Sequence, residues 1–472
     1  MGPLGRRDLV LLGGGHSHVE VLRVFGQLAR QRLQRNSSSR QGLETPLEGK
    51  PVRKSGGAAG DGWGEQSEDG SGGGASAGHH LTLISRGRFT PYSGMLPGWA
   101  SGFYSYSDCH IDLQRLASYA GARLVLAEAT GIDTLARTVS FGGDDSKTVA
   151  AQPPVPYDVL SIDIGITPGS AVVPGADEHA TPVKPIDRFV RQYEKLLERY
   201  RAAAAAAAPP GTQASGGAGR DAQGPRPVPL LQVCVVGGGA GGVELAAAVR
   251  YRLEEERRRG GWSMERASVA VSLLCRGALL PGHPPHVRRL VRQLLIQRGV
   301  EVRSGDAVTE VRSRELLLYS GERVPYDECL WCTEASPAPW LSQTGLPTDP
   351  EGFLCINEKL QSEGGPSEVF AAGDVATCSS NPRPKAGVFA VRQGPPLAQN
   401  LRSFLDGEPI RPFVPQVTVS ASRAVQECRT GELNPLTAAV AENGQVPERT
   451  IQPAGALAAL RTRGKSGCWA GF

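Results

Sequence analysis

The sequence predicts an α/β fold with parallel sheets, on three observations. A glycine-rich turn between an apolar strand and a helix occurs twice, at residues 9–20 and 233–244. Strands alternate with helices after each turn, which is typical of a parallel sheet covered by helices on both faces. Residues 369–376 add a late apolar strand that ends in Gly-Asp. Two Rossmann-like, doubly wound, three-layer domains account for this order, the second inserted into the first.

The first unit becomes regular once a Ser- and Gly-rich segment, residues 34–79, is set aside as a disordered insertion. What remains is a strand at Asp8–Leu12, a helix at Val19–Gln34 and a strand at Leu81–Ser85. This strand–helix–strand unit has the length that a mononucleotide-binding unit needs.

The second unit follows another low-complexity segment, residues 202–228, which we also expect to be disordered. The pattern then predicts a strand at Leu230–Val236, a helix at Gly242–Arg257, a strand at Ser268–Leu274 and a helix at His286–Gln297. The elements describe a complete nucleotide-binding domain.

Composition fits a soluble globular protein of two or three domains. The chain has 472 residues, and its net charge of +4 is too balanced to predict a nucleic-acid partner. Nine cysteines, an odd number, suit no disulfide framework and favour a reducing compartment. We expect a cytoplasmic protein without a transmembrane segment, because no targeting segment precedes the first strand and the apolar stretch 228–249 is rich in glycine. An organelle and a homodimer both stay open.

Both glycine-rich turns have what a dinucleotide pyrophosphate needs. Glycines allow close approach to the backbone, and the N-terminus of the following helix favours negative charge. Three glycines of the second turn fit the pattern G-x-G-x-x-G, namely Gly237, Gly239 and Gly242. In the first turn Gly13 and Gly15 fit, but His18 takes the third position, which is usually small. The first turn alone could lack a ligand; two such turns suit hydride transfer between a nicotinamide and a flavin.

The acid that would bind a ribose 2′-hydroxyl is missing from both units. The residues after the second strand are Ser85-Arg86 in the first unit and Cys275-Arg276 in the second. Because arginine accommodates a 2′-phosphate, Arg276 favours NADP, although a solvated arginine explains it equally well. Glu244 lies in the first turn of the predicted helix, where the helix dipole favours a carboxylate.

Three other segments offer groups to a flavin. Asp374, after Gly373, can accept a hydrogen bond from a ribitol hydroxyl or act as a helix N-cap. Gln393 and Gly394 lead into a predicted helix whose N-terminus can face the flavin, or simply begin a surface helix. Thr90-Pro91 open a rigid turn that can wall the pocket or be a plain loop.

Other chemistries are not indicated. Cys329 and Cys332 form C-x-x-C within an apolar stretch, which favours a buried strand over a redox pair. The eight histidines show no metal-ligand spacing, so no metal is expected.

Longer strings of residues resemble one family. The most specific are Thr-Pro-Tyr-Ser-Gly-Met-Leu-Pro-Gly at 90–98 and Arg-Pro-Lys-Ala-Gly-Val-Phe-Ala-Val-Arg-Gln-Gly-Pro-Pro-Leu at 383–397. Shorter matches are Gly-Gly-Gly-His-Ser-His-Val-Glu, Leu-Ile-Ser-Arg, His-Ile-Asp-Leu, Tyr-Asp-Val-Leu-Ser-Ile-Asp and Pro-Val-Lys-Pro-Ile. In these the chain resembles the FAD-dependent pyridine nucleotide-disulfide oxidoreductases, in particular those like type II NADH dehydrogenases. It is most similar to the oxidoreductase domain fused to selenide, water dikinase, a branch in which His18, Ser85 and Arg86 are usual.

The resemblance implies FAD on the first turn and NAD(P)H on the second. The domains that follow are 8–230, first part of the FAD-binding domain; 231–335, NAD(P)H-binding domain; 336–405, second part of the FAD-binding domain; and 406–472, a divergent, weakly ordered tail.

Turn chemistry and resemblance together assign the binding residues. Those expected at FAD are Gly13, Gly15, His16, Ser85, Arg86, Thr90, Pro91, Gly373, Asp374, Gln393 and Gly394. Those expected at NAD(P)H are Gly237, Gly239, Ala240, Gly242, Glu244 and Arg276. No catalytic side chain is expected, because the flavin carries the chemistry.

The expected activity is hydride transfer from NAD(P)H to FAD and onward to an unidentified acceptor, for which a quinone is the family analogy. The alternative is a non-catalytic FAD- and NAD(P)-binding accessory module linked to selenium metabolism. It is suggested by Glu334, which replaces the glycine of the usual Thr-Gly-Ala, and by the segment after Pro415, which departs from the family pattern. We expect no dikinase domain within these residues, so no phosphoryl transfer is assigned.

Overall fold

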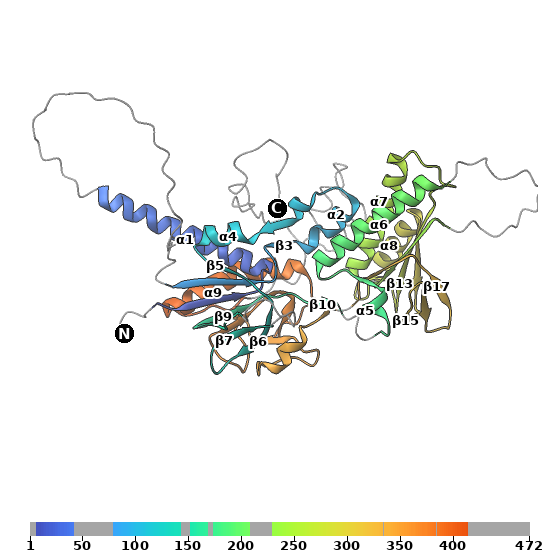
Figure 1. Ribbon diagram of the computed structural model, residues 1–472. Coiled ribbons are helices and arrows are strands. Elements are labelled where there is room, and N and C mark those ends of the chain that lie inside the picture. The colour runs from blue at the N-terminus through green and yellow to red at the C-terminus, as the bar shows by residue number, and fades with distance from the viewer. Residues whose placement is uncertain are drawn as a thin grey trace, which may run out of the picture.

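The computed structural model describes residues 6–41, 79–142, 152–168, 173–207, 229–333, 335–383 and 385–413. These residues form two lobes, each built on a five-stranded parallel sheet (Figure 1). The predicted α/β class with Rossmann-like domains is confirmed.

The sheet of the first lobe joins strands from distant parts of the chain. β1 lies at its centre, with β2 on one side and β9 on the other, all parallel. The apolar run of β1 is buried on both faces, as expected of a central parallel strand. In spatial order the strands are β21 (Val369–Ala371), β9 (Val159–Ile162), β1 (Asp8–Leu12), β2 (His80–Ser85) and β5 (Arg123–Leu126).

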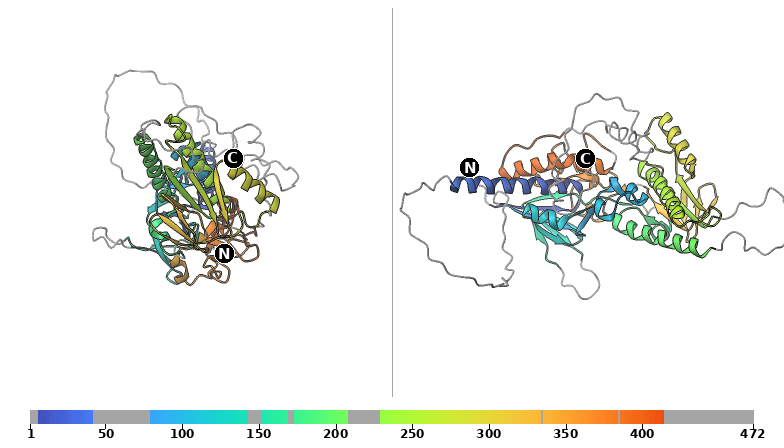
Figure 2. Two further views of the ribbon diagram at one scale, coloured as in Figure 1. Left: turned by 90° about the vertical axis from the view of Figure 1, so that its right-hand side faces the viewer. Right: turned by 90° about the horizontal axis from the view of Figure 1, so that it is seen from above.

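Helices cover one side of this sheet. α1 (His16–Gln41) and α9 (Gly387–Asp406) lie side by side along their lengths (Figure 2), and α4 (Leu113–Ala120) packs against α1. An antiparallel sheet lies on the other side in Figure 1 and contributes to the same apolar core. Its strands are β6 (Ala129–Asp133), β7 (Thr138–Phe141) and β8 (Val155–Pro156).

The second lobe repeats the arrangement. Its parallel sheet has the order β11 (Thr181–Pro182), β18 (Glu328–Trp331), β12 (Leu231–Val236), β13 (Val269–Cys275) and β14 (Val300–Ser304). Its helices are α6 (Ile186–Ala206), α7 (Ala240–Arg259) and α8 (Pro285–Gln297). An antiparallel meander follows, made of β15 (Val308–Val311), β16 (Glu315–Leu318) and β17 (Arg323–Pro325).

Short elements complete the lobes and connect them. The chain enters and leaves the second lobe through β10 (Thr167–Pro168) and β19 (Ala335–Ser336), which pair antiparallel. The others are β3 (Phe89–Pro91), η1 (Ser93–Met95), α2 (Leu96–Ser101), α3 (Tyr106–Cys109), β4 (His110–Asp112), α5 (Ala176–His179), η3 (Pro339–Gln343), β20 (Leu354–Ile356), η4 (Gly373–Val375) and β22 (Ala376–Cys378).

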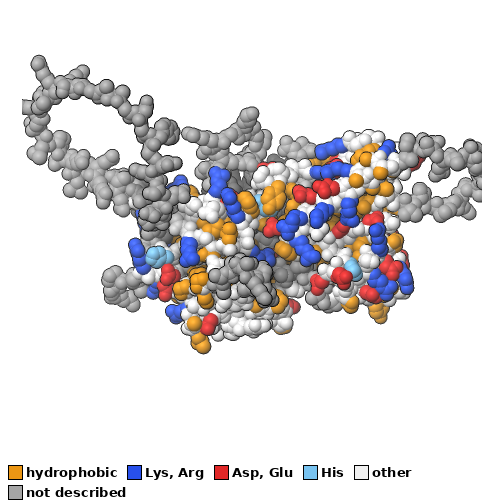
Figure 3. Space-filling view, viewed as in Figure 1, with side chains coloured by type: hydrophobic (Ala, Val, Ile, Leu, Met, Phe, Trp, Pro, Cys, Tyr) orange, Lys and Arg blue, Asp and Glu red, His pale blue; other side chains and the backbone are white. Residues whose placement is uncertain are grey.

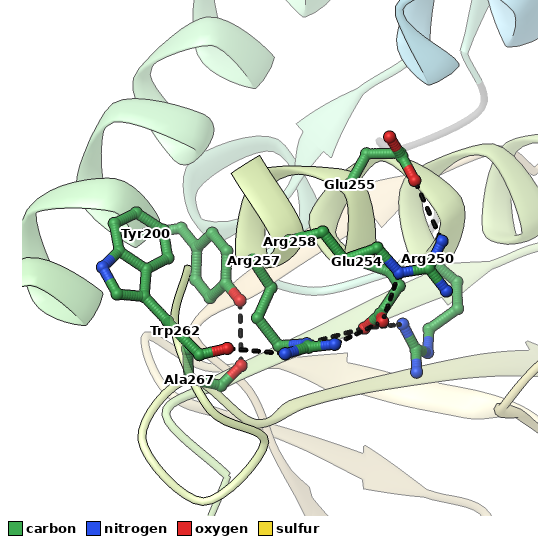
Figure 4. A network of polar contacts seen from close by, with 8 residues as sticks. All are labelled: Tyr200, Arg250, Glu254, Glu255, Arg257, Arg258, Trp262 and Ala267. Atoms are coloured by element: carbon green, nitrogen blue, oxygen red, sulfur yellow. Dashed lines mark hydrogen bonds and ion pairs between the residues drawn. The ribbon is translucent and has the colours of Figure 1, made fainter. Parts of the chain in front are cut away.

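Polar contacts anchor the C-terminal end of α7 in the second lobe (Figure 4). Arg257 donates to Glu254 and to the carbonyl of Trp262, while the hydroxyl of Tyr200 on α6 donates to the carbonyl of Ala267 at 2.8 Å. The loop after α7 is therefore held to both helices. On the face seen in Figure 3, basic and acidic side chains are interspersed over this lobe, in keeping with its content of ion pairs.

The predicted start of each disordered insertion is wrong, because a helix continues into it. Residues 34–41 continue α1, and the alanine tract up to Ala206 continues α6, because alanine has the highest helix propensity and Ala204 packs in the core. Residues 42–78 and 208–228, Glu334 and the tail from 414 onward lie outside the described residues.

The last helix also begins earlier than predicted. Proline is common at the first helical position, which favoured a start at Gly394, but α9 begins at Gly387 and carries Pro395 and Pro396 inside. Contacts with α1 hold the two turns before the prolines. The Ser17 hydroxyl donates to the carbonyl of Ala390 at 2.8 Å, and Gly394 packs against α1.

An aromatic cluster packs α2 against α6 in the core of the second lobe. Phe189 of α6 is fully buried, with its ring centroid 5.5 Å from Tyr193 and 6.3 Å from Trp99 of α2. We predict that Phe189→Ala lowers the free energy of unfolding by about 3–5 kcal/mol, because it removes apolar contacts and leaves a cavity. Urea denaturation followed by fluorescence would measure this loss.

Leu135→Ala is the matched control, because Leu135 is 96% exposed and its truncation should change stability by no more than about 0.5 kcal/mol. Equal stability of the two variants would show that the cluster does not contribute to the stability of the fold.

Candidate functional site

A cleft crosses the carboxyl ends of the first lobe's parallel strands. It brings together eight of the side chains and glycines predicted to bind FAD: Gly13, Gly15, His16, Ser85, Arg86, Thr90, Pro91 and Asp374. Ligands of open α/β sheets bind at this edge. The cleft continues to Lys184 before α6 and to the start of α9 at Gly387.

The first glycine-rich turn is shaped by a buried neighbour. Gly13 has φ of +102°, and a Cβ there would lie 2.2 Å from the carbonyl oxygen of Asp163. A Cβ on Gly15 would lie 2.1 Å from the carboxyl carbon of Asp163. Both positions therefore need glycine even without a ligand, and the turn presents its backbone to the cleft.

Asp163 directly follows β9, and we assigned it no role from the sequence. Its carboxylate is 2% exposed and accepts the backbone N–H of Ser17 at 2.9 Å. Burial, more than the nearby Asp374, raises the pKa of Asp163 to about 7. An acid immediately after a buried strand next to β1 was the signal that could have identified it.

His18 explains how a large residue occupies the third position of the motif. It is fully buried, with Nδ1 2.7 Å from the carbonyl oxygen of Gly13 and Nε2 2.8 Å from the Ser161 hydroxyl. Since a carbonyl only accepts, Nδ1 carries the proton and Nε2 accepts from Ser161. Burial lowers the pKa of His18 to about 4, so the ring is neutral at pH 7.

Charged side chains lie at both ends of the cleft. Lys184 Nζ donates to Asp374 Oδ2 at 3.0 Å, which places a cation and a carboxylate at one end. At the other end Arg86 lies 3.6 Å from Glu128, which follows β5 and also lines the cleft. The carboxylate that is missing after β2 is thus supplied by Glu128, after the neighbouring strand of the sheet, β5. That strand lies outside the strand–helix–strand unit recognised in the sequence, so the motif alone does not identify Glu128.

Three predicted FAD residues lie behind Asp374 rather than along the cleft. The N–H of Gly373 donates to Gln393 Oε1 at 2.7 Å, and both residues line a separate small cavity. Gly394 is buried against α1, where a Cβ would lie 2.6 Å from the Cβ of Glu20.

The second glycine-rich turn leaves the N-terminus of α7 open. Gly239 is the N-cap, so no side chain accepts from the first N–H groups, and a Cβ there would meet no atom within 4 Å. Gly237 and Gly242 are instead close-packed; a Cβ on Gly242 would lie 1.9 Å from the Gly237 carbonyl oxygen. Gly239 and Ala240 are exposed and can meet a phosphate group.

The structure gives the surroundings of two charged residues predicted near this turn, Glu244 and Arg276. α7 begins at Ala240, so Glu244 lies beyond the first turn, and burial rather than the dipole dominates by raising its pKa to about 7. Arg276 is exposed at the carboxyl end of β13, beside the turn.

The two cysteines of the C-x-x-C sequence are buried thiols. Burial raises the pKa of Cys332 to about 12 and that of Cys329 well above its usual value, so both remain thiols.

In the described ranges, no helix combines the length and apolar character needed to cross a bilayer. Within the same ranges, no group of three or more His, Cys, Asp and Glu side chains is arranged to hold a metal ion.

Comparisons with known proteins agree with this geometry. The sequence profile of the pyridine nucleotide-disulphide oxidoreductase family matches residues 72–400. A NADH dehydrogenase-like protein of Mycobacterium tuberculosis is 28% identical over 301 residues, covering 62% of this chain and 64% of that protein. A type II NADH:quinone oxidoreductase of Haemophilus influenzae is 26% identical over 188 residues, 39% of this chain and 42% of that one. The chain therefore spans less than two thirds of the curated relatives it matches.

Solved structures share the fold. NDH2 from Plasmodium falciparum, in complex with NADH, superposes with a TM-score of 0.57 at 17% identity, covering 79% of this chain and 64% of that one.

The buried Asp163 predicts a pH dependence of stability. Its pKa rises from a usual 3.8 to about 7 on folding, so the native state binds the proton more tightly and loses stability as pH rises between these values. We predict that Asp163→Asn removes this loss, making the variant gain on the wild type by up to about 4 kcal/mol, at about 1.4 kcal/mol per pKa unit.

Urea denaturation between about pH 4 and pH 8 would measure the difference. The wild type must be compared with the variant, because His16 and His18 are present in both proteins. Burial lowers the pKa of each to about 4, so their contribution makes stability rise with pH, opposite to that of Asp163. A difference that stays constant across this range would contradict the prediction.

Proposed function

Because the chain belongs to the pyridine nucleotide-disulphide oxidoreductase family, whose members bind FAD and NAD(P)H, we propose that it transfers a hydride from NAD(P)H to FAD and passes the electrons to a second acceptor. One observation carries the proposal. The chain has two glycine-rich turns on separate parallel sheets, and each leads into a long helix. Two dinucleotides can be held at once.

The residues of the first lobe fit FAD. The backbone of the turn at Gly13–Gly15 and the N-terminus of α1 suit the pyrophosphate, since they offer N–H groups and a favourable dipole. Glu128 on the cleft suits a ribose hydroxyl, and Asp374 suits a ribitol hydroxyl. When bound, FAD supplies the ring that accepts the hydride.

The protein's own part is orientation and electrostatics. Lys184 provides a cation at the end of the cleft nearest Asp374, where the start of α9 adds the positive end of a helix dipole. Thr90 and Pro91 form a wall of the cleft from β3. These groups would fix the ring and favour negative charge on it.

The second lobe is the proposed NAD(P)H site, over residues 231–335. The exposed N-terminus of α7 at Gly239 and Ala240 suits the pyrophosphate, and Arg276 at the end of β13 suits an adenosine ribose or its 2′-phosphate. The proposed FAD domain then comprises residues 336–405 and residues 8–230 apart from β11 and α6, which belong to the second lobe.

The acceptor is proposed from the relatives. The Haemophilus protein is named as an NADH:quinone oxidoreductase, so a quinone is the first candidate. The strings at 90–98 and 383–397 support a closer kinship with the oxidoreductase domain fused to selenide, water dikinase.

We predict that Gly239→Val blocks reduction of the bound flavin by NAD(P)H and leaves flavin content unchanged. A side chain at Gly239 has open space around it, so folding is unaffected, but it would occupy the approach of the pyrophosphate. Stopped-flow absorbance of the yellow protein mixed with NADH and with NADPH measures the reduction.

Gly131→Val is a matched control on β6 in the other lobe, where a Cβ would lie 3.8 Å from the nearest atom. Unchanged flavin reduction in the Gly239 variant would disprove the second site. A yellow wild type that ignores both nicotinamides would favour a non-catalytic binding module.

A further inference from the structure

A second cavity lies behind Asp374, on the side away from the FAD cleft. Asp374 lines both spaces, while Phe389, Arg392 and Gln393 from the first turns of α9 line only the second. Arg383 and Lys385, between β22 and α9, complete its polar wall. Arg383, Lys385 and Arg392 have no part in the proposed hydride transfer.

The cavity wall has an excess of positive charge. Three cations, Arg383, Lys385 and Arg392, face one carboxylate, Asp374, which already accepts from Lys184 at 3.0 Å. Lys385 is satisfied, because its Nζ donates to the Ala376 carbonyl at 2.7 Å and the Thr377 hydroxyl at 2.8 Å. The two arginines therefore carry the excess.

Both arginines present nitrogen atoms that lack acceptors. Arg383 Nε and Arg392 Nη1 are buried from solvent and have no hydrogen-bond partner in the part of the chain that the structure describes. Buried N–H groups are normally satisfied, and a guanidinium is matched best by the oxygens of a carboxylate or phosphate-like group.

The start of α9 strengthens the same preference. This 20-residue helix begins at Gly387, and its N-cap, Ala386, has no side-chain acceptor for the first N–H groups. The positive end of its dipole therefore adds to the two guanidinium groups.

The size of the cavity limits the ligand. About 30 Å³ is free for atom centres, roughly twice what one water molecule needs. A carboxylate or a small tetrahedral oxyanion fits this volume, whereas a ring system does not.

We propose that this cavity is an anion-binding site that holds one carboxylate or small oxyanion between the side chains of Arg383 and Arg392. Asp374 separates the site from the flavin cleft, so an anion bound there would lie next to the cleft but outside it. The site would bind an anion whether or not the protein transfers a hydride.

The test is titration of the full-length, FAD-loaded protein with sodium phosphate and, separately, sodium acetate, at ionic strength held constant with sodium chloride. Isothermal calorimetry measures the dissociation constant. We expect saturable binding of at least one anion, weakened about tenfold or more by Arg383→Gln and by Arg392→Gln, because each removes a charge-assisted donor. The anion that binds more tightly identifies the source, inorganic oxyanion or carboxylate.

Two controls keep the outcome specific. Arg402→Gln removes an arginine from the same helix that pairs with Asp406 at 3.5 Å, and it should bind the anion as the wild type does. Gly239→Val alters the other phosphate-binding turn and should also retain binding. If a glutamine variant loses its flavin, the corresponding lysine variant is used, and it should bind more weakly than the wild type because it lacks the guanidinium fork.

Equal affinity in the wild type and in both cavity variants would assign the anion to another site and overturn the proposal. So would the lack of saturable binding of either anion. Flavin reduction by NAD(P)H is measured independently, so failure of the anion site leaves the proposed activity standing.

Discussion

Burial of one carboxyl group, that of Asp163, constrains the whole first lobe. Three glycines from two segments pack against this residue: Gly13 and Gly15 of the first turn, and Gly373 after β21. A side chain at any of them would overlap Asp163, and Gly373 also has φ of +72°. The same carboxylate accepts the N–H of Ser17, so it ties the end of β9 to the start of α1 and to the loop after β21.

The second lobe reaches a similar turn without such a group. There Gly237 packs against the Cys332 carbonyl, and Gly242 packs against Gly237 itself. Gly239 and Gly241 instead face open space. Glycine thus serves two purposes in this chain: in the first turn it makes room for a buried acid, and in the second it clears a path to a helix N-terminus. The glycine pattern by itself does not distinguish these two purposes.

Local patterns were enough to predict the parallel sheets, both glycine turns and the helices α1, α7 and α8, because these depend on periodicity and on the needs of a tight turn. They failed where distant residues decide. α9 begins at Gly387 because α1 supports it across the fold, despite Pro395. Asp163 and Glu128 were not predicted from the sequence, because each reaches the cleft from a strand far along the chain. Pairing of strands, not the composition of any one segment, brings them to the site.

The buried polar groups also set the charge that a pyrophosphate would meet. His16 and His18 lie in the first turn of α1, yet burial lowers the pKa of both to about 4, so neither supplies positive charge at pH 7. Asp163, with a pKa of about 7, can remain protonated and then adds no repulsion. An anion at this turn would therefore be balanced by the dipole of α1 and by the Lys184 side chain that lines the same cleft. Because ionised Asp163 would add a negative charge beside the pyrophosphate, we expect flavin affinity to weaken above pH 7, where Asp163 loses its proton.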